Sequence, residues 1–140
     1  MHDLDERVRD AVDGLPGKER RAMMQSRYRS CVDSMVDELG TEEQVRVISC
    51  AQSPKLGRGV LALTDDRLVF CCTRSGTASW ALDDIRSVEG RRGAFTLPSA
   101  ITLHTDDERF IFTLGVGRRY GPTFVAAVEA AVPAAHGMAA

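Results

Sequence analysis

The sequence predicts an α+β fold: a small antiparallel barrel or sandwich of seven strands, with helices before and after it. The spacing of apolar residues is helical before Gly40, changes to that of strands until about Gly117, and then becomes helical again. Pairs of adjacent aspartates separate several of the apolar runs. Aspartate suits tight turns because it tolerates left-handed backbone and hydrogen-bonds its own local main chain. Short strands separated in this way form antiparallel meanders.

The first forty residues predict two helices joined by a short turn. Asp3 and Glu6 have the spacing of a helix-capping pair, and residues 14–17 end the first helix. Pro16 suits the first turn of a second helix, and Gly40 is its expected C-terminal cap. One face of this second helix is apolar and carries Met24, Tyr28, Cys31, Val32, Met35, Val36 and Leu39. We therefore expect a helical hairpin arm over residues 1–40 that must cover this face.

Seven strand candidates follow, over residues 45–52, 58–64, 67–73, 78–82, 85–90, 100–104 and 109–114. The last two alternate between apolar and polar residues, which predicts one buried and one solvated face. The second and third are apolar on both faces. A large exposed apolar surface is uncommon on a soluble monomer. We therefore expect either the N-terminal helices or a second copy of the chain to cover them.

A final helix is predicted to begin at Gly121 and Pro122 and to end at Pro133. Its apolar stripe would allow it to plug one end of the barrel. The expected organisation is an arm over residues 1–40, a β domain with its final helix over residues 41–133, and a flexible tail over residues 134–140.

Two adjoining motifs resemble the bacterial PH-like and GRAM-like families. They are Gly59-Val-Leu-Ala-Leu-Thr-Asp-Asp-Arg-Leu-Val-Phe70 and Ala81-Leu-Asp-Asp-Ile-Arg-Ser-Val88. Those families carry a leucine-threonine-x-x-arginine-leucine hairpin and then a leucine-x-x-isoleucine-x-x-valine strand. The resemblance covers about residues 41–132 and implies a pleckstrin-homology-like barrel capped by a C-terminal helix. The chain departs from eukaryotic PH domains because Trp80 lies in a strand, with no tryptophan in the last helix. The helical arm is also outside the shared domain.

The hairpin motif also has a local physical role. We expect Thr64 to hydrogen-bond at the start of the turn and Arg67 to pair with an acid of the same turn. Such contacts would fix the register of two core strands. The motif therefore predicts shape more than chemistry.

Composition and motifs exclude several classes of function. A net charge of −2 provides no global basic field of the kind found in dedicated nucleic-acid binders. The acidic first residues are not followed by an apolar run, so we expect no secretory signal and a cytoplasmic location, possibly peripheral to a membrane surface. The four cysteines lack the spacing of metal ligands and are expected to be reduced. No nucleophile elbow, phosphate loop or zinc-ligand pair occurs. We expect no enzyme activity, cofactor, metal site or small-molecule substrate.

Basic residues mark one alternative function, peripheral binding to anionic membrane lipids. Lys55 and Arg58 lie where the resemblance to lipid-binding PH domains implies headgroup contacts, although the further arginine of that pattern is replaced by Val60. Two basic pairs could extend such a patch if they converge in space. The candidate ligand-binding residues are Lys55, Arg58, Arg91, Arg92, Arg118 and Arg119.

The preferred interpretation is a non-catalytic binding or scaffolding module that binds a protein partner or self-associates, most simply as a two-fold dimer. The candidate interface is the helical face formed by Met24, Tyr28, Cys31, Met35 and Leu39. A second alternative is nucleic-acid binding through the arginine-rich second helix. Its arginines do not share one face, however, and their stems can simply cover the apolar seam.

Overall fold

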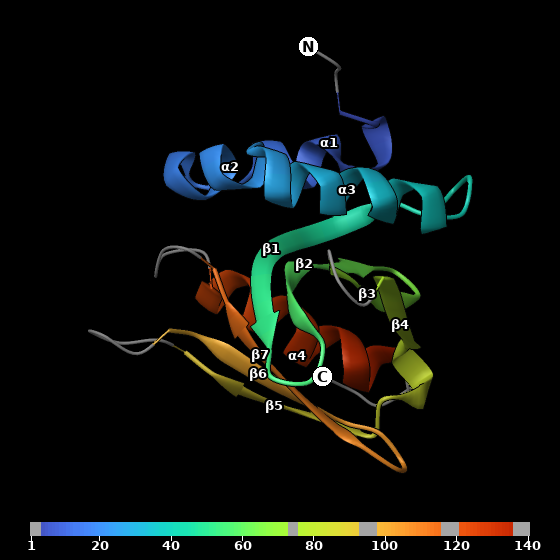
Figure 1. The fold of residues 1–140 in the computed structure, drawn as a ribbon. Helices are drawn as coiled ribbons and strands as arrows, with labels where there is room; N and C mark the ends of the chain where they lie inside the picture. Colours follow the sequence, from blue (N-terminus) through green and yellow to red (C-terminus); the bar gives the residue numbers. More distant parts are fainter. Residues whose placement is uncertain (1–3, 73–75, 93–97, 116–120, 136–140) are drawn as a thin grey trace.

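The computed structural model describes residues 4–72, 76–92, 98–115 and 121–135, and its helices precede and follow a single mixed-length sheet (Figure 1). The N-terminal helices are α1 (Glu6–Asp13), α2 (Gly17–Met23) and α3 (Ser26–Glu38). The strands are β1 (Val45–Ser53), β2 (Gly57–Thr64), β3 (Arg67–Cys72), β4 (Gly76–Ala81), β5 (Ser87–Arg91), β6 (Ala100–His104) and β7 (Arg109–Leu114). A short 3-10 turn, η1 (Leu82–Asp84), links β4 to β5, and α4 (Gly121–Ala135) follows the sheet.

The sheet has the strand order β4-β3-β2-β1-β7-β6-β5, and each pair of neighbouring strands is antiparallel. β1 joins the two halves: it pairs with β2 along its length but with β7 only near its end, at Ala51 and Gln52. The halves also meet in the core, where the Phe70 and Phe112 ring centroids lie 5.1 Å apart. The predicted seven-stranded antiparallel fold is therefore confirmed.

Burial along the strands follows the apolar pattern of the sequence. Ile101, Leu103, Phe112 and Leu114 are buried, whereas Arg109 between them in the hairpin is exposed. On β2 and β3 both faces are buried, and α3 packs against these two strands. Figure 1 shows the N-terminal helices as a layer over one side of the strands. Of the two expected covers for this apolar face, the chain therefore provides its own.

The N-terminal helices differ from the predicted hairpin. The segment expected as one helix is divided into α2 and α3, because Gln25 is extended with φ −77° and ψ 153°. This break lets α2 pack on β1 while α3 packs on β2 and β3. The cap of α1 is Asp5, whose carboxylate accepts a hydrogen bond from the Arg7 main-chain N–H, whereas Asp3 lies outside the described residues. The C-cap of α3 is Leu39 in an extended conformation, not a left-handed Gly40.

The helix α4 packs against β5, β1, β6 and η1, and Phe124, Val125 and Val128 on it are fully buried. Pro133 does not end the helix as expected but lies inside its last turn. One missing N–H donor there removes a single intrahelical hydrogen bond, so the helix can continue to Ala135. No helix among the described residues is long and apolar enough to cross a membrane.

Buried side chains of α1, α2 and α3 belong to the same hydrophobic cluster as those of the sheet and α4. Val8, Met23 and Met35 are each 0 % exposed. The helices before Gly40 are thus part of the core. The predicted division of the chain into an arm and a β domain stays a prediction.

Candidate functional site

The hairpin between β2 and β3 is held partly as predicted. The Thr64 hydroxyl accepts hydrogen bonds from the main-chain N–H groups of Asp66 and Arg67, each at 3.2 Å. The expectation that Arg67 pairs with an acid of the same turn is wrong. Arg67 instead binds Glu43 in two places, Nη2 to Oε1 and Nε to Oε2, both at 2.9 Å. Asp65 of the turn pairs with Arg46 on β1.

Glu43 is the centre of this arrangement. It also accepts hydrogen bonds from the Thr64 hydroxyl at 2.9 Å and from the Gly40 N–H at 3.0 Å. The hydrogen bonds from Arg67 are the main cause that lowers the pKa of Glu43 to about 2. Arg67 Nη2 reaches on to the carbonyl oxygen of Glu38 at 2.7 Å, which connects the end of α3 to β3. Arg67 is therefore a structural residue whose guanidinium is already occupied.

The predicted basic candidates are not brought into one patch by the described part of the chain. Lys55 Nζ lies 3.6 Å from Glu108 Oε2 and 5.0 Å from the ring centroid of Phe110. Arg92 pairs with Glu129 on α4 at 3.2 Å, and Arg91 donates to the carbonyl of Pro98. Arg118 and Arg119 lie outside the described residues.

Arg58 and Arg91 occupy one row across the sheet, but they stand far apart. Arg58 pairs with Gln52, Gln52 with Thr113, Thr113 with Ala100, and Ala100 with Arg91. Four interstrand steps of about 4.8 Å place the two strands roughly 19 Å apart along the sheet. One phosphate cannot bridge that distance. The two residues could contact only an extended anionic surface.

The predicted interface face lies largely inside the chain. Cys31, Met35 and Leu39 are 2 %, 0 % and 7 % exposed, and Met24 and Tyr28 are half-buried against the core. The uncovered apolar surface that favoured a dimer at this face is therefore not present. Self-association, if it occurs, needs another surface.

The four cysteines behave as buried apolar residues. All are free and buried, and burial raises the pKa of the Cys31 thiol to about 11 and that of Cys50 to about 12. A protonated thiol is a poor nucleophile and metal ligand. Among the described residues no group of three or more histidine, cysteine or acidic side chains is placed to hold a metal ion.

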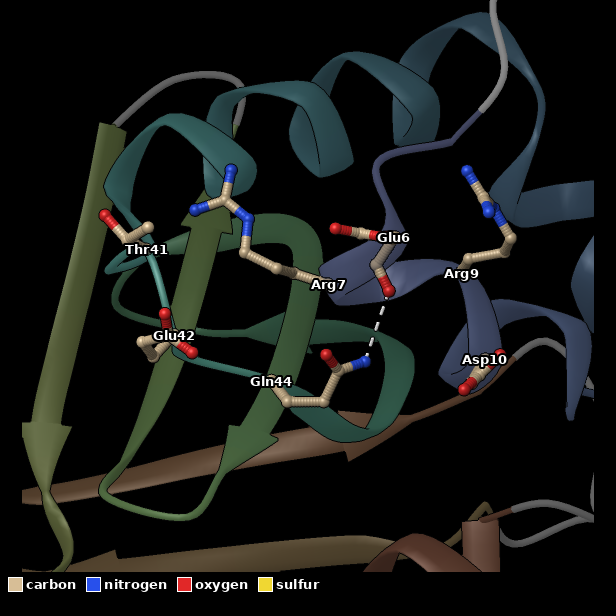
Figure 2. A pocket seen from close by; sticks show the side chains of 7 residues that line it. All are labelled: Glu6, Arg7, Arg9, Asp10, Thr41, Glu42 and Gln44. Carbon is tan, nitrogen blue, oxygen red and sulfur yellow. Dashed lines mark hydrogen bonds between the residues drawn. The ribbon is translucent and has the colours of Figure 1, made fainter.

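One hollow, of about 450 Å³, lies between α1 and the segment that leads into β1 (Figure 2). Its polar groups are used to fix α1. Arg7 Nη1 donates to the carbonyls of Leu39 and Gly40 at 3.1 and 3.0 Å, and Gln44 Nε2 donates to the carbonyl of Glu6 at 3.2 Å. The lining also mixes acids and bases, so no single charge is presented. We interpret this hollow as a structural junction.

A second hollow, of about 570 Å³, lies between α3 and the strands β3 and β4. Two exposed acids, Asp37 and Glu38, stand at the end of α3 on its rim. The described residues that line it include no basic side chain. They are Ser30, Cys31, Ser34, Asp37, Glu38, Cys71, Cys72, Gly76 and Thr77. We call this hollow the α3–β4 groove.

The α3–β4 groove adjoins a free edge of the sheet. Within the part of the chain that the structure describes, β4 is the last strand on its side and pairs with β3 alone. The N–H of Leu82 donates to the carbonyl of Asp66 at 2.9 Å. This bond fixes which residues of β4 hydrogen-bond to β3: those at an even number of positions from Leu82. Alternate residues of an antiparallel strand turn their N–H and C=O to opposite sides. Thr77, Ser79 and Ala81 therefore turn these groups away from β3, and in the described chain no other segment hydrogen-bonds them.

Comparisons with known proteins place the fold. The structure aligns with the "Vps36 N-terminal PH domain" with a TM-score of 0.54 and 20% sequence identity, over 69% of this chain and 83% of that one. The fold is PH-like. The C-terminal domain of an unknown protein from Leishmania infantum aligns with a TM-score of 0.53 and 18% identity, over 70% of this chain and 93% of that one. At these identities the likeness shows the PH-like fold alone.

A third solved structure, a DUF1696 family protein with a pleckstrin-homology domain from Shewanella loihica PV-4, aligns with a TM-score of 0.49 and 14% identity. The alignment covers 73% of this chain and 89% of that one. No protein-family model matches the chain, and no curated protein matches it.

Neither the β4 edge nor Glu43 was singled out from the sequence. The position of a strand in a sheet depends on long-range pairing, which no local pattern encodes.

Proposed function

We propose that this chain is a non-catalytic protein-binding module that accepts an extended segment of its partner at the edge of β4. One observation carries the proposal. Among the described residues, a row of main-chain N–H and C=O groups at Thr77, Ser79 and Ala81 has no hydrogen-bond partner, and this row lies beside the α3–β4 groove. Strand addition to such an edge is a common mode of peptide recognition, in which main-chain hydrogen bonds supply affinity and adjacent pockets supply specificity.

The composition of β4 supports this use. Natural sheets usually protect an exposed edge with charged residues, proline, bulges or a covering element. β4 contains only Gly, Thr, Ala, Ser and Trp, and its register with β3 is continuous over all six residues. An undefended edge of this kind risks aggregation unless it has a partner. Binding another chain is the use that fits it best.

The absence of catalysis belongs to the same proposal, because the polar groups described above serve structural contacts. His104 on β6 has Nε2 3.4 Å from Glu89 Oε1 on β5, and this Nε2 is buried and makes no hydrogen bond among the described residues. The hairpin motif also favours a relationship to the bacterial GRAM-like families, which we include as part of the proposal.

Three alternatives draw less support. Membrane binding through the basic loops would require Lys55 and Arg92 to exchange their present acidic partners, Glu108 and Glu129, for lipid phosphates. Self-association remains compatible with a free edge, since a second copy could also pair with β4. For nucleic-acid binding, the described residues offer a hollow of about 470 Å³ beside Arg20 and Arg21, but its lining also contains Asp13 and the apolar residues Leu4, Val12 and Met24.

The proposal is tested by selecting peptides from a displayed library of random short sequences on the full chain. The Ser79→Pro variant is the matched control, because it removes one outward N–H donor while leaving the ladder with β3 intact. We expect the native chain to enrich peptides that Ser79→Pro does not enrich. These peptides should slow amide exchange at Thr77, Ser79 and Ala81. Equal recovery on both chains would overturn the proposal.

A further inference from the structure

One face of β4, which carries the side chains of Thr77 and Ser79, is directed toward α3. The Thr77 hydroxyl is 3.6 Å from Cys71 Sγ, and the Ser79 hydroxyl accepts a hydrogen bond from Arg67 Nη1 at 3.3 Å. Arg67 in turn binds the carbonyl of Glu38 at the end of α3. The side chains of Thr77 and Ser79 are thus on the face of the sheet that α3 covers.

A strand added to β4 must therefore send every second side chain toward the α3–β4 groove. Directly paired residues of neighbouring antiparallel strands point to the same face. The residue opposite Ser79 would enter beside the end of α3, and its second neighbour would enter beside Thr77. The groove would consequently contact these alternate side chains and determine which sequences bind.

The negative charge at the end of α3 gives the groove a preference for positively charged side chains. Asp37 and Glu38 are exposed, and neither takes part in any ion pair found among the described residues. The nearby cation Arg67 is already bound to Glu43. The groove therefore presents negative charge with no basic residue in its described lining.

From this we infer that the partner segment is a basic extended peptide, with a lysine or arginine in the position that pairs with Ser79. This rests on the proposed function and deepens it by naming the chemistry of the partner. The long aliphatic stem of either residue can cross the mouth of the groove while its charged end reaches Asp37 and Glu38. Main-chain hydrogen bonds from Thr77, Ser79 and Ala81 hold the segment in register.

A second copy of the chain fits this groove less well. Residues 76–81, the part of a second copy that would pair with β4, carry no basic side chain. Two-fold pairing would also bring a second pair of acids, at positions 37 and 38, to the same side of the joined sheet. Like charges so placed oppose association. A basic segment removes both difficulties.

The test compares the sequences of peptides selected on three full-length chains: native, Asp37→Asn/Glu38→Gln, and Asp83→Asn/Asp84→Asn. The last is the matched control, since Asp83 and Asp84 are adjacent exposed acids on η1 that do not line the groove. Native and control chains should enrich peptides that carry a lysine or arginine at one fixed position, the one that pairs with Ser79. Binding of these peptides should weaken about five- to tenfold on Asp37→Asn/Glu38→Gln and should also weaken as salt is raised.

The outcomes separate the two proposals. Peptides that protect the β4 amides without any basic preference would overturn this inference and leave strand binding at β4 intact. A doubled mass in solution that Ser79→Pro abolishes would overturn it in favour of a second copy. Failure to enrich any peptide over Ser79→Pro would overturn both the inference and the proposed function.

Discussion

The two outermost strands of the sheet, β4 and β5, differ in how they are protected. β5 carries Glu89 and Arg91, and α4 packs closely over it. A side chain at Gly90 would overlap Val125 on α4, so only glycine allows this approach. β4 carries no charge and faces α3 only across an open groove. The β5 edge is thus protected both by charged residues and by a closely packed helix. In the described chain the β4 edge has neither protection, and it is the edge that we assign to binding.

Proline substitutions within β4 should give the largest contrast. Ala78 turns its N–H toward Phe70 on β3, whereas Ser79 turns its N–H outward. Ala78→Pro should therefore lower the free energy of unfolding by about 2–3 kcal/mol through the lost ladder hydrogen bond. Ser79→Pro should lower it by less than about 1 kcal/mol. Urea denaturation of both variants measures this difference. Equal losses of unfolding free energy would contradict the assignment of Ala78 N–H to β3 and Ser79 N–H to the free edge.

Crowding the contact between β5 and α4 should have the next largest effect. Gly90→Leu would force a side chain into Val125 and Glu129, and overpacking of this kind typically costs about 1–3 kcal/mol. Gly40→Ala is a suitable control, because a methyl group there would meet Glu43 atoms only at ordinary contact distances of 3.8 and 3.9 Å. Unchanged thermal unfolding of Gly90→Leu would contradict the close packing of α4 on β5.

Glu43→Gln should weaken the side of the sheet next to β4. The ion pair with Arg67 is partly shielded, since the Glu43 side chain is 11 % exposed. Replacing the carboxylate removes charge-assisted hydrogen bonds and should cost about 1–2 kcal/mol. Asp106→Asn, which disturbs the fully exposed pair with Arg86, should destabilise the fold much less than Glu43→Gln does. Chemical denaturation of the two variants compares a shielded ion pair with an exposed one.

The same carboxylate predicts a pH dependence of stability. The pKa of Glu43 falls from an ordinary 4.5 to about 2 in the folded chain, mainly through its hydrogen bonds with Arg67. A lowered pKa stabilises the folded state above the unfolded value, and that contribution disappears as pH falls from about 4.5 toward 2. The native chain should therefore lose more stability over this interval than Glu43→Gln. Parallel acid titrations that coincide would contradict this assignment.

The sequence was informative where structure is local. The Thr64 turn, the strand pattern and the final helix all depend on neighbouring residues, and each is found. Arg67 pairs with a residue 24 positions away, so its partner had no local signal. The break at Gln25 has no glycine or proline to mark it, and it separates a helix that packs on β1 from one that packs on β2 and β3. The candidate site was missed because it depends on which strand lies at the edge, a property of the whole fold.

Amide hydrogen exchange along β4 tests the central claim most directly. In the free chain, the outward amides of Thr77, Ser79 and Ala81 should exchange much faster than those of Ala78 and Trp80, which donate to β3. A bound basic peptide should slow the first group and leave the second unchanged. Slow exchange at Thr77, Ser79 and Ala81 in the free monomeric chain would contradict the account, because it would show that this edge is already covered.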